Sequence, residues 1–453
     1  MKVSCDIKRL INAGIILAGI FSFRNTTAAP CPCDIYEAAG TPCVSAHSTV
    51  RALYEAYDGP LYQIRRTSDK ATKDIGLLSP GGYVNMAEQE SFLDGKTGTI
   101  SIIYDQSPNK NDLPKAPPSL WQKDGGTESK TSEGKHKVNG YNVNGIYVTG
   151  YSTNVGYRNV TAKGLAINDE PEAMYMVVDG KRYSDQCCFN YGNVGKTGTD
   201  EGNATMECIY WGSDITWGGK GDGSGPWIAA DLENGVYKGD RGGWQSQSLY
   251  WPDSKSIIAS YATAMLKGYS GNRYVLKGGD AQSGKLTTMW DGARPRTYSP
   301  MKKQGQIVLG TGGDGSNGGT GTFFEGCITK GVPSDDVDEA IQENIVAAGY
   351  GNATTSLLHR SSRAVPSGAI FKVRYHATPG AMILSYTLST TRSVTVTVFD
   401  QQGRQTATIT KGRISAGRHE ARWETNGIAS GAYVVKLDVD GRAGWAGRIT
   451  VGK

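Results

Sequence analysis

The sequence predicts a mainly β protein with a large body and a small C-terminal β-sandwich, and three observations support this prediction. Glycine is abundant, at 61 of 453 residues, and 24 tyrosines and nine tryptophans accompany it, a composition typical of short strands and many turns. Short apolar or alternating runs recur between turn-forming residues. The charge also changes along the chain, because residues 364–453 hold twelve Lys and Arg against five Asp and Glu, whereas the middle of the chain is acidic.

Residues 1–29 predict a secretory signal peptide. Basic residues at its start precede the apolar run 11–23, and small residues at 26–29 end it. The alternative is a single membrane anchor, for which this apolar run is short, and no later run is long and apolar enough to span a bilayer. We therefore expect a protein that is secreted or attached to the cell surface, with no membrane span in the mature chain.

The body, residues 30–351, predicts many short strands. They are expected where runs of apolar and β-branched residues lie between turn signals, as in TISIIY (99–104), AMYMVV (173–178) and GQIVLG (305–310). The spacing of these runs favours a sheet protein with minor helices over a helical bundle.

Two helices are expected to interrupt the strands of the body. The second of them spans 333–349, because acids occupy its first turn, apolar residues repeat every four positions from Val337 to Ile345, and Gly349 ends it. The first is expected to begin near Ser45, since four apolar residues would then share one helix face: Val50, Leu53, Tyr54 and Tyr57.

After the body, the chain predicts a linker at 352–366 and a second domain at 367–453. In this domain the run SVTVTVF alternates valines with polar residues, and strands recur every eight to twelve residues, which indicates a small β-sandwich. Its basic residues are scattered singly, so we expect a solvated surface and no nucleic-acid partner. Three aromatic residues are expected to pack in its core, with a sugar-binding platform as the alternative: Trp423, Tyr433 and Trp445.

Removal of the signal leaves seven cysteines, so at least one is unpaired. Export favours disulfides over metal thiolates, and the five histidines are scattered, so we expect no metal and no cofactor. Cys187 and Cys188 are adjacent. A bond between them would close a strained ring, because neighbouring Cα atoms lie about 3.8 Å apart, below the usual disulfide range of about 4.4–6.8 Å. The alternative is that each bonds another cysteine, such as Cys208 or Cys327.

Five segments of the body resemble one enzyme family in their order along the chain: CDIYEAAGTPC (33–43), IIYDQSPNKNDL (102–113), CCFNYGN (187–193), GPWIAADLENG (225–235) and LGTGGDGSNGGTGTFFEG (309–326). Together they closely resemble the catalytic module of glycoside hydrolase family 54, the α-L-arabinofuranosidases, over about residues 33–350. The C-terminal domain resembles the immunoglobulin-like domain of flagellar hook-capping proteins and of some bacterial sorting domains.

The resemblance implies a concanavalin-like β-sandwich followed by an immunoglobulin-like domain. It also implies a retaining hydrolase that releases terminal L-arabinofuranose from arabinoxylan or arabinan, for which two carboxyl groups must lie about 5–5.5 Å apart. By motif, the nucleophile would be Glu233 in ADLEN and the acid/base would be Asp314 in GGDGSNG.

The residues themselves are compatible with these roles. On a strand, Asp231 and Glu233 would face the same side, although two ordinary surface acids would show the same spacing. Asp314 follows Gly312 and Gly313, and glycines permit a close approach of the backbone to a sugar, although Gly-Asp-Gly is also a plain turn sequence.

Further site residues are implied by the resemblance. A Cys187–Cys188 disulfide would form an apolar plate under the sugar ring, and Trp217 would flank it. Cys33 and Cys43 would form a short-loop disulfide, leaving Cys31 as the odd cysteine. Glu207 would support the pocket. Hydroxyl groups would be bound by side chains or main chain at four positions: Asp231, Asn234, Gly235 and Gly313.

Two departures from the family concern targeting. SFLDGKTG (91–98) lacks a second small disulfide loop, and nothing resembles the family's arabinose-binding β-trefoil. The expected partners are arabinose-containing plant cell-wall polysaccharides, with the C-terminal domain serving export, surface attachment or spacing through secretion machinery or the cell surface. The alternatives are a non-catalytic lectin on the same sandwich and a structural or adhesion protein. Only the enzyme requires Glu233 and Asp314 together.

Overall fold

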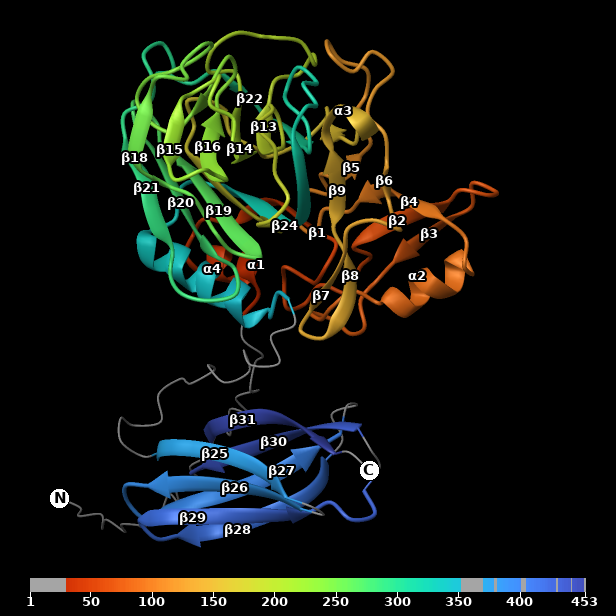
Figure 1. The fold of residues 1–453 in the computed structure, drawn as a ribbon, viewed down its shortest axis with the longest axis vertical. Coiled ribbons are helices and arrows are strands. Elements are labelled where there is room, and N and C mark those ends of the chain that lie inside the picture. Colours follow the sequence, from red (N-terminus) through yellow and green to blue (C-terminus); the bar gives the residue numbers. More distant parts are fainter. Residues whose placement is uncertain are drawn as a thin grey trace, which may run out of the picture.

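The computed structural model describes residues 30–351, 370–378, 381–400, 405–428, 431–440 and 442–451. Strands far outnumber helices in these ranges, which confirms the mainly β prediction (Figure 1). Among these residues, no helix is long and apolar enough to cross a membrane. The expected signal peptide and the expected linker lie outside the described residues and stay predictions.

The largest sheet of the body has seven strands in the order β1-β24-β12-β19-β20-β21, with β9 also paired to β24. The central strand β12 is buried along its whole length, because both of its faces are covered. The predicted strand AMYMVV lies within it. The bounds are β1 (Cys43–Ser48), β9 (Ile146–Thr149), β12 (Glu172–Asp179), β19 (Tyr261–Gly268), β20 (Tyr274–Asp280), β21 (Thr287–Gly292) and β24 (Thr320–Lys330).

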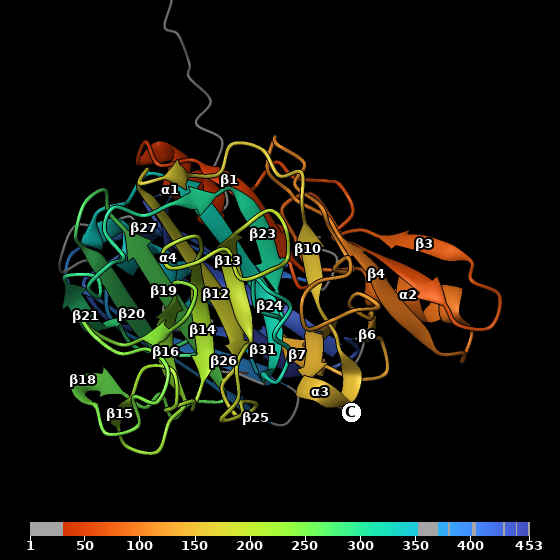
Figure 2. The same cartoon turned by 90° about the horizontal axis from the view of Figure 1, so that it is seen from above.

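A second sheet of six strands packs against the first, with β14 and β16 contacting β19 and β20 (Figure 2). This face-to-face arrangement is the sandwich that the sequence predicts. The predicted strand GQIVLG contains β23. The bounds are β10 (Tyr157–Asn159), β13 (Asn190–Val194), β14 (Glu207–Gly212), β16 (Trp227–Asp231), β17 (Val236–Tyr237) and β23 (Gln306–Leu309).

The remaining strands of the body form a five-stranded sheet and three short pairs. The five-stranded sheet contains the predicted strand TISIIY in β4. Its bounds are β2 (Tyr62–Arg66), β3 (Thr72–Ile75), β4 (Gly98–Ile103), β5 (Leu113–Pro114) and β6 (Ser129–Lys130). The pairs join β7 (Lys135–Val138) to β8 (Tyr141–Asn144), β11 (Ile167–Asn168) to β22 (Lys303–Gln304), and β15 (Lys220–Asp222) to β18 (Tyr250–Lys255).

Of the two predicted helices in the body, one is confirmed. α4 (Asp335–Ala347) begins with three acids in its first turn and buries Ile341 and Ile345. The structure also contains helices that were not predicted: α1 (Pro32–Ala38), α2 (Met86–Leu93) and α3 (Gly150–Thr153).

The helix expected near Ser45 is wrong. Residues 43–48 form β1, which pairs with β24, and the following segment runs as turns. Val50 and Leu53 are nevertheless fully buried, so their apolar spacing reflects core positions and not a helix face. Sheet pairing satisfies the backbone of 43–48, and tertiary contacts override the local periodicity.

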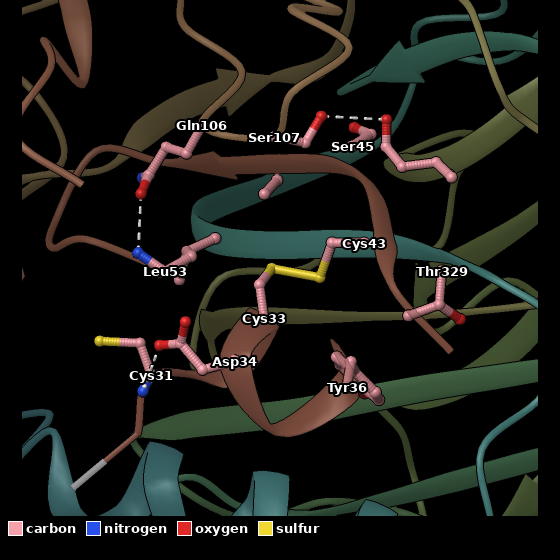
Figure 3. The surroundings of a disulfide bond; sticks show 12 residues. Cys31, Cys33, Asp34, Tyr36, Cys43, Ser45, Leu53, Gln106, Ser107 and Thr329 are labelled. Carbon is pink, nitrogen blue, oxygen red and sulfur yellow. Dashed lines mark hydrogen bonds between the residues drawn. A yellow bond between two sulfur atoms is a disulfide. The ribbon is translucent and has the colours of Figure 1, made fainter. Parts of the chain in front are cut away.

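The Cys33–Cys43 disulfide joins α1 to the start of β1 (Figure 3). Close to it, the Cys31 amide donates to Asp34 Oδ2 at 3.0 Å, and the Leu53 amide donates to Gln106 Oε1 at 2.7 Å (Figure 3). Three further cysteines of the described part of the chain are free and buried: Cys31, Cys208 and Cys327.

The C-terminal domain contains a three-stranded and a four-stranded sheet. Alternating valines of β27 are fully buried, and Trp423 and Tyr433 are buried with their rings 5.2 Å apart, which favours the core role predicted for them. The side chain of Trp445 lies outside the described ones. The bounds are β25 (Ile370–Thr378), β26 (Ala381–Leu388), β27 (Arg392–Phe399), β28 (Gln405–Ile414), β29 (Gly417–Glu424), β30 (Gly431–Val439) and β31 (Arg442–Val451).

Candidate active site

A cavity of about 690 Å³ opens in the body where β16 ends near the loop that follows β23. Segments that are far apart in the sequence meet here, as expected of a ligand site built from loops on a rigid sheet. The cavity is lined by all the residues that were predicted to cleave or bind the sugar: Cys187, Cys188, Trp217, Asp231, Glu233, Asn234, Gly235, Gly313 and Asp314.

Asp231 and Glu233 enter the cavity from a sharp turn and not from one strand face. β16 ends at Asp231, and Glu233 and Asn234 both adopt positive φ angles, 70° and 58°. Such angles are uncommon for a glutamate and are retained where surrounding contacts hold them. The Tyr298 hydroxyl donates to the Glu233 carbonyl at 2.6 Å, and the Glu233 amide donates to Asp231 Oδ1 at 3.3 Å. The strand alternation expected for these two acids is therefore wrong, although both line the cavity.

Asp314 reaches the cavity on the glycine-rich loop after β23. A Cβ atom built on Gly313 would lie 3.3 Å from Glu233 Oε2, so this loop passes directly beside the Glu233 carboxylate. Asp314 Oδ1 accepts from the Ser316 amide, and Oδ2 accepts from Trp121 Nε1, each at 2.9 Å. Two donors thus fix the plane of the Asp314 carboxylate.

The electrostatics of the cavity favour retention of protons. Burial first, and then the nearby carboxylates of Asp231 and Asp314, together raise the pKa of Glu233 to about 9. Burial also raises the pKa of Asp231 to about 7, against a hydrogen bond from Asn190 that lowers it. At neutral pH the cluster of three carboxyls therefore holds at least one proton, which is the state that paired acid/base chemistry requires.

Cys187 and Cys188 are bonded to each other through their sulfur atoms, and the peptide between them is cis. Cys188 Sγ lies 3.2 Å from Asp231 Oδ2, a packing contact because a disulfide sulfur has no proton to donate. The disulfide thus presents sulfur atoms to the cavity beside Asp231. Bonded sulfurs offer no thiolate to a metal ion, although both sulfurs and Asp231 lie close together.

Trp217 lines the cavity, and it is partly buried beside Cys187. Its ring centroid lies 4.6 Å from that of Trp244, which is 60% exposed. A Cβ atom on Gly235 would overlap the Tyr237 ring, so the close approach of Tyr237 requires glycine at this position. The side-chain N–H of Asn234 donates to Asp200 Oδ1 at 3.1 Å, so the side-chain oxygen of Asn234 is left for other partners.

Glu207 does not line the cavity, so the supporting role predicted for it is wrong. Its side chain is fully buried between the two sheets and pairs with Arg294 at 2.9 Å and with Lys303 at 2.8 Å. The physical reason is that side chains alternate between the two faces of a strand. Cys208 pairs with Asp231, so the side chain of Glu207, one position before Cys208, points to the opposite face and into the ion cluster of the interior.

Sequence reasoning missed several aromatic residues of the cavity. Trp121, Tyr151 and Trp244 line it and are 65%, 69% and 60% exposed. Large exposed aromatic side chains at a cavity rim are typical of binding surfaces. Trp121 and Trp244 lie in turn segments near glycines, a signal that could have been used, but Tyr151 lies in the short helix α3, and no local pattern places the three in one cavity.

The body matches known enzymes over nearly its whole length. A sequence profile of the family described as α-L-arabinofuranosidase B, catalytic, matches residues 32–351. A probable α-L-arabinofuranosidase B of Aspergillus fumigatus is 45% identical over 388 residues, covering 81% of this chain and 72% of that relative.

Two solved structures are similar as well, and each covers 80% of this chain and 73% of its own with a TM-score of 0.67. One is an arabinofuranosidase complexed with arabinofuranosyl-α-1,2-xylobiose, 40% identical, and the other is a glycoside hydrolase family 54 α-L-arabinofuranosidase soaked with a cyclic sulfate inhibitor, 41% identical. The coverage of the chain, the sandwich and the shared segments agree. The chain therefore belongs to glycoside hydrolase family 54 and is an α-L-arabinofuranosidase.

Proposed function

We propose that the protein is a secreted, retaining enzyme that removes terminal L-arabinofuranose by double displacement, with Glu233 as the nucleophile and Asp314 as the acid/base. The observation that supports this most directly is the position of Gly313, whose Cβ site lies 3.3 Å from Glu233 Oε2. The residue next to it brings a second carboxyl group to the same cavity. Asp314 also acts on the Glu233 carboxyl electrostatically, and a retaining mechanism requires two such carboxyls about 5–5.5 Å apart, whereas an inverting one needs a wider gap for a water molecule.

In the first step, the Glu233 carboxylate forms a bond to the anomeric carbon of the arabinose while the bond from that carbon to the leaving oxygen breaks. Asp314 gives its proton to this oxygen, and the alcohol leaves. In the second step, Asp314 takes a proton from water, the water oxygen bonds to the anomeric carbon, and the bond to Glu233 breaks. Both residues return to their starting states.

The protonation of the carboxyl groups in the cavity is compatible with this scheme. The raised pKa of Glu233, about 9, keeps one proton on the pair at neutral pH. In the transition state, positive charge develops on the anomeric carbon, and this charge stabilises the ionised carboxylate of Glu233. The proton shared by the pair then resides on Asp314. The arrangement predicts that kcat/KM declines at alkaline pH, where the pair loses that proton.

Recognition of the sugar is proposed to rest on Asp231 and on the disulfide. Asp231 is held by Asn190 at 2.8 Å, so its carboxylate is positioned to accept from furanose hydroxyls. The Cys187–Cys188 sulfurs would contact the apolar face of the ring, and Trp217 would limit the cavity on the side of Trp244.

The polymer substrates are proposed to be arabinoxylan and arabinan or their oligosaccharides. The relative that was solved with arabinofuranosyl-α-1,2-xylobiose supports the xylan side of this proposal. The apolar run and small residues within positions 1–29 support export. The C-terminal domain is proposed to serve export, attachment or spacing, and deletion of residues 364–453 tests it by comparing hydrolysis of insoluble arabinoxylan with hydrolysis of a small arabinoside.

Azide rescue assigns the two carboxyl groups independently. In Glu233→Ala, azide is expected to replace the nucleophile and give an arabinofuranosyl azide of inverted configuration. In Asp314→Ala with an activated aryl arabinofuranoside, azide is expected to attack the glycosyl-enzyme and give an azide of retained configuration. Both products are identified by nuclear magnetic resonance. Inverted azide from Asp314→Ala, or retained azide from Glu233→Ala, would reverse the assignment of roles.

A further inference from the structure

We infer that Trp121 is the positioning residue of the acid/base: its indole N–H orients the Asp314 carboxylate, and its exposed ring forms the wall against which the leaving sugar lies. This inference rests on the proposed role of Asp314. Trp121 lies 193 positions from Asp314 in the chain, yet two hydrogen bonds join them. Trp121 Nε1 donates to Asp314 Oδ2 at 2.9 Å, and the Trp121 amide donates to the Asp314 carbonyl at 3.2 Å.

The segment that carries Trp121 is docked on the Asp314 loop. The Ser119 amide donates to the Gln122 carbonyl at 3.0 Å and closes a turn, and the Leu120 amide donates to Gly198 at 2.8 Å. A Cβ atom on Gly315, the residue after Asp314, would overlap the Ser119 side chain. The Ser119 side chain therefore packs directly against the backbone of Gly315, and this packing helps to hold the indole N–H at the carboxylate.

These bonds restrict where Asp314 can hold its transferable proton. The Ser316 amide uses a lone pair of Oδ1 and the Trp121 indole uses a lone pair of Oδ2. A proton must occupy one of the remaining lone pairs, so the two donors select the direction of proton delivery. The indole N–H also stabilises the ionised form that accepts a proton from water in the second step.

The face of the same indole is available to substrate. Trp121 is 65% exposed although its N–H is bound, and it lines the cavity together with Tyr151, which is 69% exposed. The arabinose ring needs the enclosed part of the cavity near Glu233, so a leaving xylose or arabinose unit must extend over this rim. Rigid aromatic rings are effective contact surfaces for such a unit.

The charged groups around Asp314 do not duplicate the contribution of Trp121. Asp231 and Glu233 are carboxyl groups that bring no positive charge to it, and Asp185, Asp200 and Asp214 also line the cavity. Arg158 of β10 is a cation beside this loop, and its guanidinium donates to the Gly313 carbonyl and not to the Asp314 carboxylate. The side-chain donor to this carboxylate among the described residues is the Trp121 indole.

The test compares Trp121→Phe, which removes the N–H but keeps a ring, with the matched control Trp244→Phe, at a second exposed tryptophan of the cavity. Values of kcat/KM are measured with phenyl and with 4-nitrophenyl α-L-arabinofuranoside, which share their shape. The phenoxide oxygen needs protonation by the acid in order to leave, whereas 4-nitrophenoxide is a stable anion that leaves without it. We expect Trp121→Phe to lower kcat/KM about tenfold or more for the phenyl substrate and less than about threefold for the 4-nitrophenyl substrate, with Trp244→Phe changing both equally.

A further variant, Trp121→Ala, distinguishes the contribution of the aromatic ring surface from that of the indole N–H. It should raise KM for arabinosylated xylo-oligosaccharides beyond the effect of Trp121→Phe, because the ring is lost too. Equal losses on both aryl substrates in Trp121→Phe, or no loss on either, would overturn the inference. Asp314→Asn is assayed in parallel: if it also keeps its activity on phenyl arabinofuranoside, the proposed role of Asp314 fails, whereas an inactive Asp314→Asn with an unchanged Trp121→Phe removes the positioning role alone.

Discussion

Glu207 and Glu233 are buried glutamates, one within β14 and the other just after the neighbouring strand β16, and they have opposite surroundings. Glu207 lies in β14 and pairs with Arg294 and Lys303; burial alone would raise its pKa, but the two cations outweigh burial and lower it. Glu233 follows β16, and its burial together with two neighbouring carboxyls raises its pKa to about 9. Burial is common to both, and the neighbouring charges decide whether the carboxyl stabilises the fold or remains available for chemistry.

The largest expected effect comes from neutralising the glutamate of the cavity. Glu233→Gln should lower kcat/KM on 4-nitrophenyl α-L-arabinofuranoside by about 10⁴-fold or more, because an amide cannot form the glycosyl-enzyme bond. The far-ultraviolet circular dichroism spectrum should not change. A variant that keeps more than a few per cent of the activity would show that Glu233 does not attack the sugar.

Neutralising the interior glutamate should instead weaken the fold. Glu207→Gln leaves Arg294 and Lys303 buried with an incomplete set of partners, so the free energy of unfolding should fall by about 3–5 kcal/mol. Urea denaturation followed by tryptophan fluorescence measures this loss. The matched control is Asp291→Asn, which breaks the exposed pair with Arg273 and should change stability by less than about 0.5 kcal/mol. Equal effects in the two variants would contradict the distinction.

The two glutamates should also differ in how pH affects stability. In the unfolded chain Glu233 releases its proton near pH 4.5, but in the folded protein it keeps the proton up to about pH 9. Within this window the folded state binds more protons, so the free energy of unfolding falls as pH rises. Glu233→Gln removes this contribution, so its melting temperature should exceed that of the wild type by a few degrees at pH 8, and by less at pH 5. A constant difference across this range would show that Glu233 titrates normally.

A smaller effect is expected from the disulfide of the cavity. The double variant Cys187→Ala/Cys188→Ala should weaken binding of free arabinose, measured as an inhibition constant, by about tenfold, or about 1.4 kcal/mol. The control is Cys33→Ala/Cys43→Ala, which removes the disulfide between α1 and β1 and should lower stability by about 2–3 kcal/mol with the inhibition constant unchanged. If both double variants bind arabinose like the wild type, the sulfur plate has no role in recognition.

Some parts of the fold were predictable because their signals are local. The strands β4, β12 and β23 and the helix α4 coincide with runs whose periodicity or end residues indicate them. Residues 43–57 show the limit of such signals. Their apolar spacing suits a helix, but pairing of β1 with β24, almost three hundred residues later, makes the first part a strand. A local pattern carries no information about such a partner.

The sequence by itself determined the chemistry of the cavity: the motifs around Glu233, Asp314 and the adjacent cysteines predicted which side chains meet there. Only the tertiary structure decided how they meet. It places Glu233 in a turn with positive φ, directs Glu207 into the interior and brings Trp121 to Asp314. The physical reason is that residue types and short periods record burial and reactivity, whereas the contacts between distant segments depend on the order and packing of the sheets.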